Sequence, residues 1–275
     1  MPVETISPGS LLLAFIPAAA VVAIMHAWAQ RSGQAVLALG RMLAQLIAVG
    51  YVLVFVFEAE SAVVILSVLA LMALAAGWLA LNTVEGGRRA LFPAALAAVV
   101  AGGAPVILLV TQGILQLEPW FRPNYLVQDP LGHQQILQLE PWFRPNYLVP
   151  LAGMVFAQSM TGISLASERL RAETAGGVRF EPARNAAFRA AMIPVINSLL
   201  SVGIIFLPGM MTGQILAGVS PLLAVRYQVM VMCMIFGATG LSTALFLLIV
   251  ERDPRLRLLA GGAGTKDAPG GPGAG

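Results

Sequence analysis

Long apolar runs separated by short polar segments dominate this chain. Windows of about 20 apolar residues, the length an α-helix needs to cross a bilayer, recur seven times. The predicted spans cover residues 10–29, 34–57, 61–81, 90–110, 148–166, 191–211 and 227–250. The pattern predicts an all-α, polytopic membrane protein with about seven transmembrane helices. These form a membrane domain over residues 1–257, which a flexible tail over residues 258–275 follows.

The basic residues lie mostly on one side of these spans. Thirteen of the sixteen Lys and Arg residues fall on that side, and only Arg122, Arg144 and Arg226 fall on the other. Because basic loops stay in the cytoplasm, we expect the N-terminus outside and the C-terminus inside. No basic residue precedes the first span, so we expect it to stay as a membrane helix and not to act as a cleaved signal peptide.

The composition narrows the class of protein. Hydrophobic residues make up 58% of the 275 residues and charged residues only 11%, against about 25% charged in soluble proteins. The net charge of +3 comes from arginines in short loops, so we expect no nucleic-acid partner. Abundant Ala, Gly and Arg with a single Lys indicate a bacterial gene, and therefore a multi-pass protein of the inner (plasma) membrane.

Motifs for chemistry are missing from the sequence. The segment nearest to a phosphate-binding loop, residues 261–267, has the wrong spacing, and no HExxH motif occurs. Cys233 is the only cysteine, so one chain can form neither a disulfide nor a Cys-based zinc site. We therefore expect no catalytic residues, no metal cluster, no cofactor and no enzyme activity of its own. The spans contain essentially no Asp, Glu or Lys, which favours a permease driven by a separate ATPase over a gradient-driven transporter.

Several segments carry a family resemblance. They read RMLAQLIAVGYVL, PLAGMVFAQSM, RAAMIPVIN, LPGMMTGQILAG and SPLLAVRYQVMV. The chain resembles the FetB/YbbM-like permease family, the membrane subunits of ABC-type metal exporters. The resemblance implies a permease subunit that forms a homodimer in the bilayer and works with a cytoplasmic ABC ATPase. It also implies metal export, with iron as the first candidate. A stand-alone channel or membrane scaffold without an ATPase is the alternative.

A basic segment between the fifth and sixth spans, residues 167–190, is the candidate for coupling to an ATPase. Pro182 suits the first turn of a short helix, on which Phe180, Arg184 and Phe188 recur at four-residue spacing. Such a helix could dock in a groove of a partner. An interfacial helix whose arginines only hold orientation is the alternative. The candidate coupling residues are Glu181, Arg184, Phe188 and Arg189.

Uncharged polar groups in the later spans indicate a polar route through the membrane. Asn197, Ser198 and Ser201 lie within about one helical turn, and Gln158 of the fifth span could face them. Methionine thioethers could pass a soft metal ion, although Met is also common filler in apolar helices. The clustered residues are Met154, Met160, Met210, Met211, Met230, Met232, Met234 and Cys233. The candidate path residues are Gln158, Asn197, Ser198, Ser201, Met210 and Met211.

Two further sequence features bear on packing and on loops. Gly209 and Gly213 form a GxxxG motif that permits close helix approach within or between subunits. The sequence ILQLEPWFRPNYLV occurs at residues 114–127 and again at 136–149, so the predicted outer loop contains a tandem duplication. Outer loops accept insertions at little cost, which favours a duplication without function. A lid or a partner-binding site is the alternative.

Overall fold

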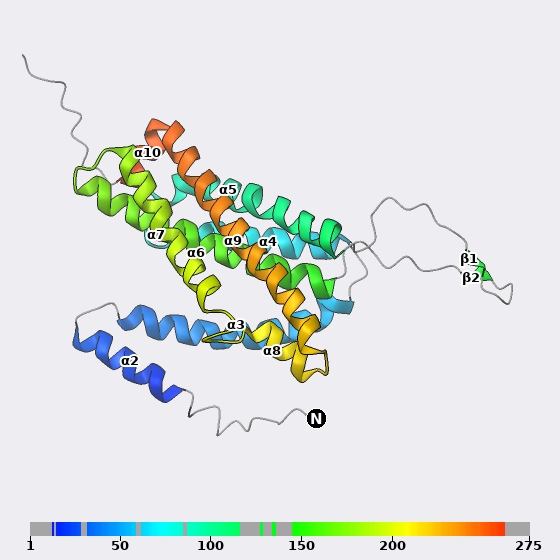
Figure 1. Ribbon diagram of the computed structural model, residues 1–275. Helices are drawn as coiled ribbons and strands as arrows, with labels where there is room; N and C mark the ends of the chain where they lie inside the picture. The colour runs from blue at the N-terminus through cyan, green and yellow to red at the C-terminus, as the bar shows by residue number, and fades with distance from the viewer. Residues whose placement is uncertain are drawn as a thin grey trace, which may run out of the picture. The chain divides into compact units, whose positions relative to one another are not determined.

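The computed structural model describes residues 13, 15–28, 32–58, 62–84, 87–115, 127–128, 134–135 and 145–261 (Figure 1). The chain separates into two units, Met1–Ala59 and Glu60–Gly275. In the first unit, α2 (Phe15–Ala27) contacts α3 (Ser32–Glu58). The second unit holds the remaining elements, and the candidate site lies within it.

The second unit is a bundle of long helices. Its helices are α4 (Ala62–Ala80), α5 (Arg88–Leu108), α6 (Pro145–Ala175), α7 (Phe180–Ser201), α8 (Gly209–Leu216), α9 (Pro221–Arg252) and α10 (Pro254–Gly261). A π-helical segment, η1 (Leu109–Ile114), continues α5. Figure 1 shows α5, α6 and α7 beside α9, which contacts all three and α8 as well. α9 is therefore the central helix of this unit.

Most of the duplicated segment lies outside the described residues. Its described part includes β1 (Val127–Gln128) and β2 (Gln134–Gln135), which pair antiparallel. The predicted tail overlaps α10 at residues 258–261, and its remaining residues also lie outside the described part of the chain.

Five of the predicted spans are confirmed as helices long and apolar enough to cross a membrane. They are α3, α4, the α5–η1 segment, α6 and α9, and α2 is a shorter apolar helix. Each is close to its predicted range, although α6 and α9 extend several residues beyond it. The chain is thus a helical membrane protein. The total of seven spans and the side of each terminus stay predictions.

The predicted sixth span, residues 191–211, is wrong as a continuous helix. α7 begins earlier, at Phe180, and ends at Ser201, and α8 begins only at Gly209. Gly203 adopts φ +80°, a left-handed conformation that interrupts a helix. Pro208 also restricts the residue before it to extended backbone and lacks an N–H donor. The helix therefore stops at Ser201, well before the proline, and restarts directly after it, at Gly209.

Small residues allow α9 to cross α5 and α6 closely. A Cβ atom added to Gly102 of α5 would lie 2.7 Å from the Cα of Ser242, and one added to Gly162 of α6 would lie 2.8 Å from the Cγ2 of Thr239. At the same level the Ser242 hydroxyl donates a 2.9 Å hydrogen bond to the Oγ of Ser159, and both side chains are buried. Small residues and interhelical hydrogen bonds of this kind hold membrane helices together.

Among the described residues, the predicted GxxxG motif does not bring two helices close together. A Cβ atom added to Gly209 or to Gly213 would meet no atom within 4 Å. The close approaches inside the second unit involve Gly102, Gly103 and Gly162 instead. A contact between subunits through Gly209 and Gly213 stays a prediction.

Candidate functional site

A cavity of about 590 Å³ lies among α6, α7, α8 and α9. α6 and α9 supply half of its lining residues, α7 supplies the stretch around Pro194, and the start of α8 closes one side. Its lining residues are Met154, Gln158, Thr161, Pro194, Val195, Ser198, Phe206, Pro208, Gly209, Met210, Gln228, Val231, Met232 and Ile235. The cavity therefore combines apolar walls with a few uncharged polar groups, a lining typical of ligand-binding sites.

The break between α7 and α8 shapes this cavity. Phe206 and Pro208, which belong to the break, line it together with the first residues of α8. Within the break, the N–H of Gly203 donates a 3.0 Å hydrogen bond to the Phe206 carbonyl oxygen and so closes a tight turn. Non-helical backbone at membrane depth is tolerated where it is covered by protein or lines a cavity. The break in the predicted span thus provides part of the cavity wall.

Gln228 is the most unusual side chain of the cavity. It lies in the second turn of α9, is only 6% exposed, and its Oε1 atom has no hydrogen-bond partner among the described residues. A buried carbonyl oxygen without a partner costs about 1–3 kcal/mol. Such a group in a cavity wall is suited to accept a hydrogen bond from, or to coordinate, a molecule that enters the cavity.

The lining also determines which ligands the cavity can accommodate. All of its described side chains are uncharged, and three are methionines, Met154, Met210 and Met232. Among the described residues, no group of three His, Cys, Asp or Glu side chains could hold a metal ion. Thioether sulfur is a soft ligand, whereas the amide oxygens of Gln158 and Gln228 are harder donors. The walls thus offer weak, neutral donors and no tight cage.

The structure brings together half of the candidate path residues. Gln158, Ser198 and Met210 line the same cavity, although they come from three different helices. Asn197 is exposed on another face of α7, and Ser201 donates a 2.8 Å hydrogen bond to the Asn197 carbonyl oxygen. Met211 is not part of the lining. Of the other clustered methionines, Met230 and Met234 are buried in the helix packing.

Gln228 and Thr161 are lining residues that the candidate set lacks. Gln228 is an amide within a long apolar run, and the sequence alone does not distinguish an amide that faces a cavity from one that faces a neighbouring helix. A useful signal is its position: Gln228, Val231 and Ile235 recur at helical spacing, so they share one face of α9.

The segment 167–190 is a helical hairpin and not an extended loop. α6 continues to Ala175, and α7 starts at Phe180. Gly177 has φ +81°, the N–H of Val178 donates to the Glu173 carbonyl oxygen, and the N–H of Gly177 donates to that of Thr174. These bonds form the Schellman motif that ends a helix. The predicted short helix after Pro182 is therefore the first part of the long helix α7.

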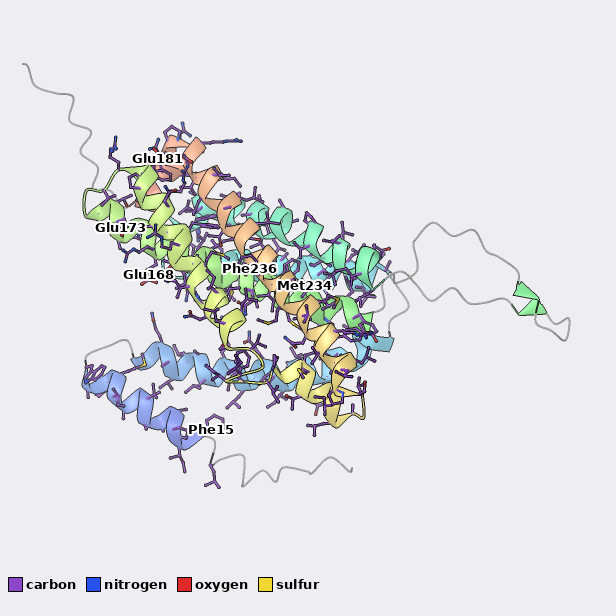
Figure 2. The ribbon with its side chains drawn as sticks, viewed as in Figure 1. Phe15, Glu168, Glu173, Glu181, Met234 and Phe236 are labelled. Atoms are coloured by element: carbon purple, nitrogen blue, oxygen red, sulfur yellow. The ribbon has the colours of Figure 1, made fainter. Side chains whose placement is uncertain are left out.

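The candidate coupling residues lie at different places on this hairpin. Glu181 is exposed near the tip, and Figure 2 labels it at this end of the second unit. Arg184 instead forms a 2.6 Å ion pair with Glu251 at the end of α9. Phe188 and Arg189 lie further along α7, at a groove between α7 and α9. Only Glu181 of the four thus stands at the tip of the hairpin.

Basic side chains gather at the same end of the second unit, which we name the basic end. The guanidinium of Arg88 lies 4.2 Å from the centroid of the Trp78 ring, and Arg171 donates a 3.3 Å hydrogen bond to the Thr83 carbonyl oxygen. The guanidinium of Arg257 lies 4.6 Å from the centroid of the Phe180 ring. These contacts join the α4–α5 connection, the α6–α7 hairpin and α10. Arg226, by contrast, lies near the opposite end of α9.

The ion pair between Arg184 and Glu251 provides a test of this arrangement. Reversing Arg184 alone to Glu is expected to lower stability by about 1 kcal/mol, because the pair is partly exposed and two carboxylates would then face each other. Reversing both, with Arg184→Glu and Glu251→Arg, should restore most of the loss. Thermal unfolding of the purified variants measures both effects. No recovery in the double variant would show that the pair does not hold α7 to α9.

Comparisons with known proteins found a matching family model and several similar proteins. The model of the family described as "Uncharacterised protein family (UPF0014)" matches residues 9–132, 130–177 and 178–253. The Synechocystis protein named "UPF0014 membrane protein slr1647" is 34% identical over 227 residues, which are 77% of this chain and 79% of the relative. No solved structure matches the chain.

Two other relatives carry names that refer to metals. The Escherichia coli protein named "Probable iron export permease protein FetB" is 27% identical over 219 residues, 74% of each chain. The Arabidopsis thaliana protein named "Protein ALUMINUM SENSITIVE 3" is 28% identical over 249 residues, 82% of each chain.

Proposed function

Because this chain belongs to the family described as Uncharacterised protein family (UPF0014), whose matched members include membrane proteins, we propose that it is the membrane subunit of an ABC-type exporter. The cavity among α6, α7, α8 and α9 is the observation that carries the proposal, with Gln228 in its lining, whose Oε1 has no hydrogen-bond partner among the described residues. In this proposal the cavity is the translocation route. The chain itself hydrolyses no nucleotide, and a separate cytoplasmic ATPase supplies the energy.

The proposed cargo is a metal, with iron first. The name of the Escherichia coli relative supports this choice. A route lined by neutral amide and thioether groups suits transport, because a cargo must bind weakly enough to leave again. Gln158, Ser198, Met210 and Gln228 are the residues proposed to contact it.

The proposed orientation places the basic end in the cytoplasm. Thirteen of sixteen basic residues lie on that side of the predicted spans, and the contacts of Arg88, Arg171 and Arg257 bring three of the basic segments together. The positive-inside rule then puts the C-terminus in the cytoplasm and the N-terminus outside. The proposed location is the inner membrane of a bacterial cell, and the proposed assembly is a homodimer with two ATPase subunits.

The α6–α7 hairpin is the proposed contact with the ATPase. Its tip carries the exposed residues Arg179 and Glu181, whereas Arg184 is already paired with Glu251. A short, capped hairpin transmits a push to both helices, and α6 and α7 both line the cavity. ATP-driven movement at the tip could thereby change access to the route.

Reversing both tip charges is the test of this coupling. The double variant Arg179→Glu/Glu181→Arg should still insert in the membrane but should lose stimulation of ATP hydrolysis by the co-expressed ATPase, because both docking charges change sign. The matched control is Arg226→Glu, which changes a charge at the opposite end of α9 and should keep stimulation. ATP hydrolysis in reconstituted vesicles is the readout. Equal stimulation by the tip variant and the parent would favour a channel or scaffold that needs no ATPase.

A further inference from the structure

A second hollow of the molecule is separate from the proposed route. It is a groove of about 1010 Å³ between α7 and α9, on the side of these helices that includes Phe236. α7 contributes residues from Arg184 to Ile196, and α9 contributes residues from Phe236 to Leu248. Figure 2 shows Phe236 midway along α9, far from the tip of the hairpin at Glu181. The groove therefore follows the two helices from the basic end toward their middle.

The two ends of the groove differ in character. Near the basic end it is lined by Arg184, Asn185 and Arg189, and beyond them the lining is apolar. Arg184 is neutralised by Glu251 at 2.6 Å. Arg189 is exposed and makes no ion pair or hydrogen bond with any described residue. One unneutralised cation thus lies at the head of a long apolar channel.

The length of the groove matches one leaflet of a bilayer. From Arg184 to Ile196 the axis of α7 rises about 18 Å at about 1.5 Å per residue. Arg189 lies about 8 Å along that rise, and its long side chain can extend back toward the headgroups. Half of the hydrocarbon core of a bilayer is about 15 Å thick. In a membrane, the arginine end then lies at headgroup level and the apolar end lies near the bilayer centre.

We propose that this groove binds one phospholipid with an anionic headgroup, from the leaflet on the side of the basic end. The negatively charged phosphate, which no cationic substituent neutralises, pairs with Arg189, assisted by Asn185, and an acyl chain lies along the apolar lining. The anionic headgroup meets Arg189 and the acyl chain meets apolar side chains, each at the depth where a bilayer places that part of a lipid. The site requires only that the helices span the membrane, so it does not depend on the proposed transport function.

Charge and depth disfavour the other occupants. A second copy related by a two-fold axis along the membrane normal would bring the same surface of both chains together at the same depth. Arg189 would then approach its own counterpart, while the described lining of the groove holds no acid and Glu251 is already paired with Arg184. A cytoplasmic protein cannot fill the apolar part, which lies within the hydrocarbon.

Lipid retention by the purified full-length protein tests the proposal. Native mass spectrometry would compare phosphatidylglycerol with phosphatidylcholine of identical acyl chains. We expect the parent to retain phosphatidylglycerol preferentially. Arg189→Gln should reduce that preference about fivefold, the effect of one arginine near an anionic headgroup. The matched control Arg226→Gln should leave it unchanged, because Arg226 lies at the other end of α9.

A second variant tests whether the apolar part of the groove holds an acyl chain. Gly237 lines the groove, and a Cβ atom added there would meet only the Cγ2 of Val106, at 4.0 Å, so Gly237→Leu can fold with its side chain in the groove. This variant should lower retention of both lipids. Equal retention of both lipids by the parent, or an equal effect of the Arg189 and Arg226 variants, would overturn the proposal. So would efficient disulfide cross-linking between two copies of Phe236→Cys in a Cys233→Ser background, because it would place a second copy in the groove.

Discussion

Replacing Gln228 with Met is expected to lower metal transport about tenfold and to leave the protein at least as stable as the parent. Transport should fall because the substitution removes the amide of a side chain that lines the cavity, a contact of about 1.4 kcal/mol. Stability should not fall, because Met has a similar length and flexible shape and the lost oxygen has no partner among the described residues. Iron transport in reconstituted vesicles and thermal unfolding in detergent measure the two effects.

Thr243→Val is the matched control for this variant. The Oγ1 of Thr243 is also buried and has no hydrogen-bond partner in the described part of the chain. Thr243 also belongs to α9, but it lines neither the cavity nor the groove. Val keeps the shape of Thr and removes the hydroxyl. We expect this variant to be as stable as the parent and to transport at the same rate. Transport losses of equal size in both variants would mean that Gln228 has no special role.

Replacing Gly102 with Ala is expected to destabilise the second unit by about 1–3 kcal/mol or more. The added Cβ atom would overlap the backbone of Ser242, and the crossing of α5 and α9 would have to open. Helix propensity alone predicts the opposite sign, because Ala stabilises a helix by about 1 kcal/mol relative to Gly. Thermal unfolding and size-exclusion chromatography of the detergent-solubilised variant provide the measurement.

The same change at Gly213 is the control. A Cβ atom there meets nothing within 4 Å, so Gly213→Ala should be neutral or slightly stabilising in an isolated chain. If Gly102→Ala were tolerated as well as Gly213→Ala, the close crossing of α5 and α9 would be contradicted. If Gly213→Ala weakened only the oligomer, the GxxxG motif would be an intersubunit contact.

The sequence predicts most of the helices because an apolar run of sufficient length has few other solutions in a membrane. Its prediction fails at residues 191–211, where hydropathy stays high through a break that Gly203 and Pro208 impose. Hydropathy measures how well each residue suits hydrocarbon, and it does not report backbone conformation. For the same reason hydropathy does not predict the length of α7. Its first half is polar, yet it remains helical and packs against neighbouring helices.

The site is only partly predictable because it depends on which helix faces which. Gln158 and Ser198 could be paired by their polar character within apolar spans, and both do line the cavity. Asn197 has the same character but lies on another face of α7, since one residue along a helix turns the side chain by about 100°. Likewise, a glycine allows a close approach only where another helix lies opposite. The backbone of Ser242 lies opposite Gly102, whereas a Cβ atom added to Gly209 meets no described atom within 4 Å.

The most direct test of the proposed route compares chemical modification at two adjacent residues. Ser198 lines the cavity and Asn197 does not, so Ser198→Cys and Asn197→Cys, each in a Cys233→Ser background, form a matched pair. We predict that a thiol reagent blocks iron transport in vesicles containing Ser198→Cys and the ATPase, that iron slows this reaction, and that Asn197→Cys keeps its transport after modification. Full modification of Ser198→Cys with undiminished transport would contradict a route through this cavity.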